Sequence, residues 1–174
     1  MATSLLQRLD ARDRALFDRW TIERSTASRR MWIALTHMGG LWCSVAAAVL
    51  PLFVASAGVR AAALRAFMGL AISHVIVQIL KRTMLRTRPT EELGHESLVG
   101  VPDEFSFPSG HATAAMAVAL AYAMAFPMLA LPLVGIATLV GFSRVCLGVH
   151  YPSDVLAGQT IAILTDLIVF VAVR

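Results

Sequence analysis

Lys81 and Arg88, which Pro89 follows directly, form the first of three groups of residues whose types could act on a phosphate. Two further arginines, Arg82 and Arg86, lie between them. Lysine and arginine side chains neutralise phosphate oxygens, and arginine can do so with two parallel hydrogen bonds. Alone, the group is weak evidence, because basic residues at the end of a membrane helix commonly anchor it at the interface.

The second group is the run Pro-Ser-Gly-His at residues 108–111, which comes directly before an apolar segment. Backbone amides at a helix N-terminus bind phosphate well, and the glycine allows close approach. Ser109, Gly110 and His111 are therefore candidate site residues. A turn followed by a helix cap is the simpler alternative for this run taken alone.

The third group contains Ser143-Arg144, then His150 and Asp154. The last two are four residues apart, so one helical turn could bring the carboxylate to the imidazole. A carboxylate that accepts a hydrogen bond from one ring nitrogen fixes the tautomer and leaves the other nitrogen nucleophilic. The alternative is an interface histidine followed by an aspartate in the first turn of a helix.

The composition shows that membrane helices must position these groups. Hydrophobic residues make up 57% of the 174 residues and charged residues 15%, and the mean hydropathy is +0.71. Soluble domains are typically 45–50% apolar and about 25% charged. The net charge of +4 does not indicate nucleic-acid binding, since the basic residues lie at the ends of apolar runs.

The apolar runs predict an all-α transmembrane bundle of about five spans, because about 20 apolar residues cross a bilayer. We expect spans over 31–59, about 61–80, two within 112–143 joined near 126–132, and about 152–173. A polar loop, 82–107, separates the second and third spans. The connectivity places the ends of spans two and four and the starts of spans three and five on one side, so the three groups converge there.

The first thirty residues predict a different element. Residues 5–20 form an amphipathic pattern whose apolar face contains Leu5, Leu6, Leu9, Leu16, Phe17 and Trp20. We expect this helix to lie on the membrane surface. A soluble coiled segment is the alternative. The predicted organisation is an interfacial segment at 1–30 and a transmembrane domain at 31–174.

Together, the spacing Lys81-x6-Arg88-Pro89, the run 108–111 and the spacing Ser143-Arg144-x5-His150-x3-Asp154 resemble the three-part signature of the type 2 phosphatidic acid phosphatase (PAP2) family. Every position of that signature is matched. The resemblance implies that His150 attacks phosphorus, Asp154 orients it, and His111 protonates the leaving oxygen and then activates water. It also implies that phosphate oxygens are held by Lys81, Arg88, Ser109, Gly110 and Arg144.

The resemblance therefore implies a membrane lipid phosphatase that uses no metal and no other cofactor. The expected substrates are lipid phosphates of the phosphatidic acid, phosphatidylglycerophosphate or polyprenyl phosphate class. An undecaprenyl-diphosphate phosphatase that recycles the cell-wall lipid carrier is the alternative. A vanadate-dependent oxidase and a non-catalytic lipid-phosphate carrier are alternatives from other classes. The motifs recognise only phosphate, so they select neither the lipid nor an oligomeric state.

The distribution of arginine predicts the orientation. The N-terminal segment and the predicted site share one side, which carries most of the arginines. The positive-inside rule then places the site at the cytoplasmic face of the cell membrane.

Overall fold

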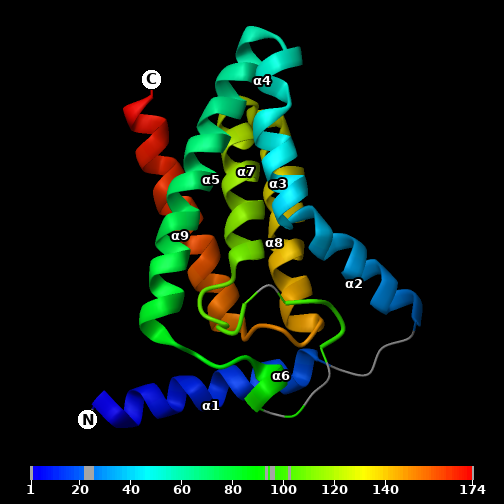
Figure 1. Ribbon diagram of the computed structural model, residues 1–174, viewed down its shortest axis with the longest axis vertical. Helices are drawn as coiled ribbons and strands as arrows, with labels where there is room; N and C mark the ends of the chain where they lie inside the picture. Colours follow the sequence, from blue (N-terminus) through cyan, green and yellow to red (C-terminus); the bar gives the residue numbers. More distant parts are fainter. Residues whose placement is uncertain (1, 22–25, 93, 95–96, 102, 174) are drawn as a thin grey trace.

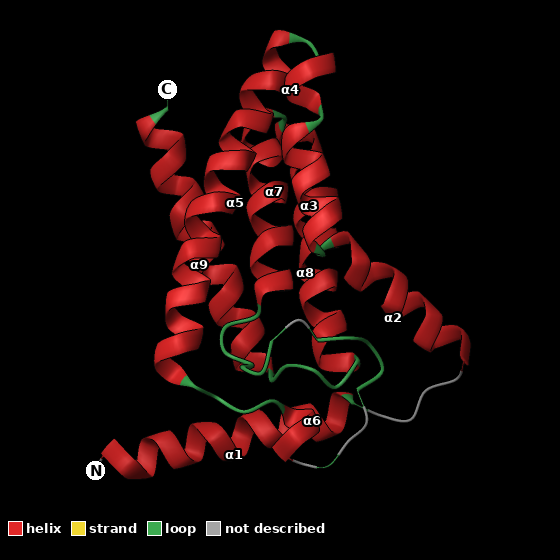
Figure 2. Ribbon diagram, in the orientation of Figure 1, coloured by secondary structure: helices red, strands yellow, loops and turns green. Residues whose placement is uncertain are grey.

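The computed structural model describes residues 2–21, 26–92, 94, 97–101 and 103–173. From α2 onward, its helices are joined by short loops, apart from the long connection between α5 (Ala57–Met84) and α7 (Gly110–Ala125) (Figure 2). This connection contains the single-turn helix α6 (Pro89–Glu92). The all-α prediction is confirmed for the described residues.

At the centre of the bundle, α7 packs against α5, α8 (Ala130–Cys146) and α9 (Pro152–Ala172) (Figure 1). Its buried face consists largely of alanines, and these small side chains allow close helix packing in a membrane. A 3-10 turn, η1 (Pro127–Leu129), joins α7 to α8 where the sequence predicts a turn. The chain therefore returns to the same end of the bundle before α9 begins.

The first predicted span is broken. Residues 31–59 are divided among α2 (Thr26–Met38), α3 (Leu41–Val49) and α4 (Pro51–Val54), and the direction changes by 44° between α2 and α3. Gly39 and Gly40 form the break, and glycine is a poor residue for a helix interior. The expected boundary at residue 30 falls inside α2.

By length and composition, three helices in the described part of the chain could cross a membrane, or four if the bent pair counts as one span. The prediction of five spans exceeds this number because α7 has only 16 residues, although it is apolar. The three helices that qualify are α5, the η1–α8 unit and α9.

The N-terminal helix α1 (Ala2–Trp20) lies across the end of the bundle where α5 ends and α9 begins (Figure 1). The sequence assigns Phe17 to a face in contact with the membrane, and the structure corrects this. Phe17 is fully buried against Tyr151, at a ring-centroid distance of 5.4 Å, and Trp20 contacts Phe142. The side chains of Leu5, Leu6 and Leu9 lie outside the described residues.

Candidate active site

The three groups predicted from sequence meet at one end of the bundle, above α1 (Figure 1). Contacts between the two ends of the long α5–α7 connection bring the first two groups together. Thr87 and Phe105 form an isolated antiparallel bridge. The amide of Ser106 donates to the carbonyl of Arg86 at 2.8 Å, and its hydroxyl donates to the carbonyl of Thr87 at 3.0 Å.

His150 lies in the turn between α8 and α9, and only 2% of it is exposed. Its Nδ1 is 3.5 Å from Oδ2 of Asp154, which is fully buried. Its Nε2 is 3.2 Å from NH1 of Arg88. Because a guanidinium can only donate, Nε2 must be the acceptor, so the neutral imidazole carries its proton on Nδ1. The lone pair of Nε2, which here accepts from Arg88, becomes the nucleophile when that guanidinium turns to a phosphate oxygen.

Burial lowers the pKa of His150 well below its usual value, and the charges of Arg144, Arg88 and Lys81 lower it further. The imidazole is therefore neutral at pH 7, as a nucleophile must be.

Asp154 is held in place from two directions. Its Oδ2 accepts a hydrogen bond from the amide of Tyr151 at 2.8 Å, at the start of α9. Its Oδ1 accepts one from Arg86 at 2.7 Å. With both oxygens fixed by other groups, the carboxylate presents a defined edge to His150.

Lys81 and Arg88 are buried and share one carboxylate, that of Asp103. Its Oδ1 is 2.8 Å from Nζ of Lys81 and 2.6 Å from NH2 of Arg88. Burial alone would raise the pKa of Asp103, but the hydrogen bonds and charges of the two cations outweigh it and hold that pKa below its usual value. The two predicted phosphate-binding cations thus have an internal anion beside them.

Arg144, at the end of α8, is 1% exposed. Its NH1 donates to the hydroxyl of Thr36 on α2 at 2.7 Å. Its Nε has no hydrogen-bond partner among the described residues. A buried guanidinium donor of this kind fits a phosphate oxygen.

The start of α7 is fixed by α9 and by the α2–α3 break. The amide of Ser109 donates to the carbonyl of Asp154 at 3.0 Å. Gly158 allows this approach, because a Cβ there would lie 2.6 Å from the carbonyl oxygen of Ser109. A Cβ on Gly39 would lie 2.7 Å from the carbonyl oxygen of His111. The two glycines let α9 and the α2–α3 junction close around the site.

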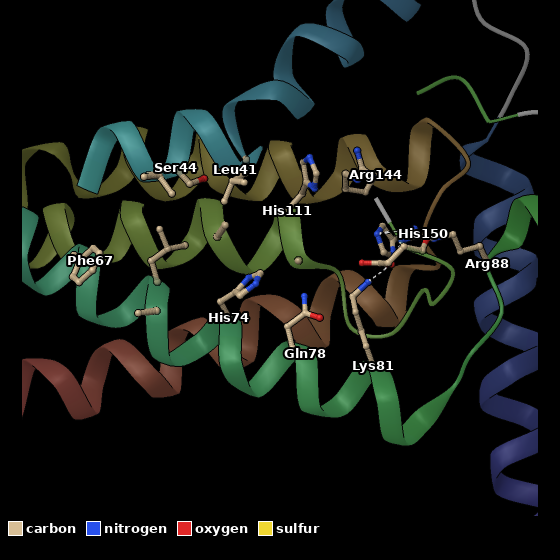
Figure 3. A pocket seen from close by; sticks show the side chains of 17 residues that line it. Leu41, Ser44, Phe67, His74, Gln78, Lys81, Arg88, His111, Arg144 and His150 are labelled. Atoms are coloured by element: carbon tan, nitrogen blue, oxygen red, sulfur yellow. Dashed lines mark hydrogen bonds and ion pairs between the residues drawn. The ribbon is translucent and has the colours of Figure 1, made fainter. Parts of the chain in front are cut away.

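A cavity of about 630 Å³ extends from these groups between α3, α5 and α7 (Figure 3). Six of the eight predicted site residues line it, namely Lys81, Arg88, Gly110, His111, Arg144 and His150. The other two do not. Asp154 is fully buried on the Nδ1 side of His150, and Ser109 is fully buried, with a hydroxyl that has no hydrogen-bond partner in the described part of the chain.

The sequence did not identify Asp103, Thr36 or the role of Arg86. NH1 of Arg86 bonds to Asp154, and its NH2 bonds to Asp13 of α1 at 2.7 Å. Asp13 also accepts a hydrogen bond from the amide of Ser153 at 2.9 Å. The only sequence signal was the placement of Arg86 inside the first basic group, where it resembled an interface anchor.

These groups can hold a phosphate, supply a neutral imidazole to attack it and place a second imidazole in the same cavity. The described residues contain no cluster of three or more His, Cys, Asp or Glu side chains that could hold a metal ion.

Comparison with known proteins extends this description. The model of the PAP2 superfamily matches residues 62–174. Decaprenylphosphoryl-5-phosphoribose phosphatase of Mycobacterium tuberculosis is 41% identical over 93 residues, which are 52% of this chain and 49% of that protein. The protein of the same name from Mycolicibacterium smegmatis is 37% identical over 133 residues, 72% of this chain and 68% of that protein.

Lipid A 1-phosphatase of Rhizobium johnstonii is 37% identical over 97 residues, 53% of this chain and 40% of that protein. The matches therefore span about half the length of the first curated relatives.

Solved structures show the same fold. A transmembrane PAP2-type phosphatidylglycerolphosphate phosphatase from Bacillus subtilis superposes with a TM-score of 0.75 at 25% identity, over 95% of this chain and 86% of that one. Aquifex aeolicus LpxE gives a TM-score of 0.76 at 23% identity, over 90% and 93% of the two chains.

Proposed function

This chain belongs to the PAP2 superfamily, and from that premise we propose that it hydrolyses the phosphate of a lipid through a phosphohistidine intermediate. The observation that carries the proposal is the burial of a neutral imidazole, with Nε2 as its nucleophilic atom, beside three cations in one cavity. The chain is a multi-pass membrane protein, and much of that cavity is apolar, as a lipid substrate requires.

In the first step, Nε2 of His150 attacks phosphorus and the bond from phosphorus to the lipid oxygen breaks. His111 gives its proton to that oxygen. In the second step, His111 takes a proton from water, whose oxygen attacks phosphorus. The nitrogen–phosphorus bond then breaks, which returns His150 and releases inorganic phosphate. Asp154 stabilises the imidazole through Nδ1 in both steps.

Phosphoryl transfer depends mainly on positioning and on neutralising charge on the equatorial oxygens. Lys81, Arg88 and Arg144 provide three positive charges, of which Asp103 offsets one. The remaining charge of about +2 matches a phosphate monoester, which carries about −1.5 to −2 at pH 7. The amide of Gly110, in the cavity lining, is a further donor in this proposal. The hydroxyl of Ser109 lies just outside that lining, buried and without a hydrogen-bond partner among the described residues, and would turn to the phosphate when it binds. No metal ion is required.

For the topology, we propose that α7 crosses the membrane together with the bent α2–α4 segment, α5, α8 and α9, which gives five crossings. Because α7 lies at the centre of the bundle, neighbouring helices rather than lipid cover much of it. The arginines of α1 lie at the same end as the site, which supports a cytoplasmic active site and an interfacial position for α1.

The relatives are named for polyprenyl-phosphosugar, lipid A, phosphatidylglycerophosphate and undecaprenyl diphosphate substrates. These names support a lipid phosphate substrate and do not select one.

The test is phosphate release by the purified protein in detergent with EDTA, across lipids of these classes and phosphatidic acid. We expect release that survives EDTA, is inhibited by vanadate and disappears in His150→Ala. Release by His150→Ala at the wild-type rate would refute the nucleophile. A complete lack of release from every lipid by the wild-type protein would refute the phosphatase function.

A further inference from the structure

Two polar side chains, those of His74 and Gln78, line the same cavity as the phosphate-binding cations. Both belong to α5 and point into the cavity from the same side of the helix as Lys81 (Figure 3). Neither has a role in the mechanism above.

Their surroundings make them unusual. The cavity wall away from the cations is mostly apolar, with contributions from Leu41, Val45, Phe67, Leu70 and Ala71. Neither His74 nor Gln78 makes a hydrogen bond within the described part of the chain. Polar side chains inside a membrane helix are costly and usually mark a functional site. Substrate hydroxyls entering the cavity would give both side chains hydrogen-bond partners.

The helix geometry indicates which part of a substrate they would meet. With a rise of 1.5 Å per residue, Gln78 lies about 4.5 Å and His74 about 10.5 Å beyond Lys81 along α5. A phosphate bound between Lys81 and His150 would therefore place the group that carries it beside Gln78 and then His74. The phosphodiester that links this group to the lipid would follow, and the apolar chain would continue towards Phe67 and Leu70. A glycerol or a pentose has about the size of this interval.

We propose that His74 and Gln78 form a hydroxyl-binding subsite, so that the preferred substrate carries its scissile phosphate on a hydroxylated group, a glycerol or a sugar, placed between that phosphate and the lipid tail. This inference rests on the proposed phosphatase function and specifies its substrate class. Gln78 can both donate and accept, and the ring nitrogens of His74 offer a hydrogen-bond site in either protonation state, so each can bind a hydroxyl.

The test compares kcat/KM for four lipids. Phosphatidylglycerophosphate and a polyprenyl-phosphoribose phosphate carry free hydroxyls beside the scissile phosphate, on a glycerol and on a sugar. Phosphatidic acid and a polyprenyl monophosphate carry none. The variants are Gln78→Leu and His74→Leu, and the control is Thr160→Leu on α9, whose exposed hydroxyl bonds only to its own helix.

We expect the wild-type protein to prefer at least one hydroxylated lipid over its unhydroxylated counterpart with the same type of tail. Each variant should reduce that preference by about threefold to tenfold, the effect of one lost hydrogen bond. The Thr160→Leu control should keep the wild-type ratio of kcat/KM between the hydroxylated and unhydroxylated lipids. A reduction only for the phosphoribose lipid would assign the subsite to a sugar, and one only for the glycerol lipid would assign it to glycerol.

Equal wild-type rates on all four lipids, or variants that keep the wild-type ratio, would overturn the subsite while leaving the phosphatase function intact. A lack of release from all four lipids would refute the proposed function itself. Vanadate inhibition measured in each variant reports on the phosphate-binding groups. One outcome is that a variant weakens vanadate inhibition by the same factor by which it lowers the kcat/KM ratio of hydroxylated to unhydroxylated lipid. That result would show that the substitution distorts the whole site and would overturn the specific role.

Discussion

Replacing Asp13 by asparagine tests whether the N-terminal helix takes part in catalysis. Asp13 is 7% exposed and lies at the end of a chain of contacts that runs through Arg86 to Asp154 and His150. The substitution preserves the shape of the side chain and removes its charge. Arg86 would keep its hydrogen bond to Asp154 but lose its 2.7 Å hydrogen bond to the carboxylate at position 13.

The magnitude follows from the contacts that are lost. A hydrogen bond to a charged group contributes about 1.5–3 kcal/mol, so we expect the free energy of unfolding to fall by about that amount. At about 2–4 °C per kcal/mol for a chain of this size, Tm should fall by roughly 3–12 °C. Because Arg86 would orient Asp154 less well, kcat should fall about tenfold, which corresponds to about 1.4 kcal/mol of transition-state stabilisation.

The assay measures kcat and KM separately, well below the Tm of the variant. We expect KM to change little, since Asp13 is remote from the phosphate-binding cations. Asp18→Asn is the matched control, because it makes the same change at an exposed position of the same helix. A lower Tm with unchanged kcat would show that Asp13 only stabilises the fold and would refute its role as a positioning residue.

Four further predictions concern single features of the site and of the helices around it. Asp103→Asn removes a negative charge beside Lys81 and Arg88, so vanadate should inhibit roughly fivefold more tightly, for about 1 kcal/mol of charge interaction; weaker inhibition would mean that Asp103 organises the cations instead. The lowered pKa of His150 means that the folded state binds fewer protons than the unfolded state below about pH 6.5, so stability should fall as pH drops below that value. His150→Gln should reduce the slope of Tm against pH, measured by thermal unfolding. The activity should follow a bell-shaped pH profile, and a rate that is flat across pH 5–9 would contradict the two-histidine mechanism. Gly158→Ala should lower Tm by forcing α9 away from the start of α7, whereas Gly135→Ala, whose Cβ meets nothing within 4 Å, should leave Tm unchanged or raise it.

The sequence determined which residues could do chemistry and on which side of the bundle they lie. Residues His150 and Asp154 are four apart, and Ser109, Gly110 and His111 are consecutive, so local spacing alone brings each group together. The apolar runs fixed the order of the membrane helices, and that order placed the ends that carry the three groups on one side. Hydropathy and helix connectivity are properties of neighbouring residues, so a single sequence reveals them.

The sequence also misled in identifiable ways. The run 31–59 contains no charged residue, so hydropathy shows no interruption, yet Gly39 and Gly40 break the helix where it must pack on His111. Phe17 has the pattern of a membrane-facing residue but is buried against Tyr151. Amphipathic periodicity shows that a helix has an apolar face and does not show whether lipid or protein covers it.

Only the tertiary structure decided how the charged groups are paired. Asp13 and Arg86 are 73 residues apart, Thr36 and Arg144 are 108 apart, and Lys81 and Asp103 are 22 apart. Each carboxylate or hydroxyl in these pairs has many cations within reach in the sequence, and no local spacing selects one. The selection is made by burial, because a charge removed from water must find a partner in the folded chain, and only the packing of the helices determines which partner is near.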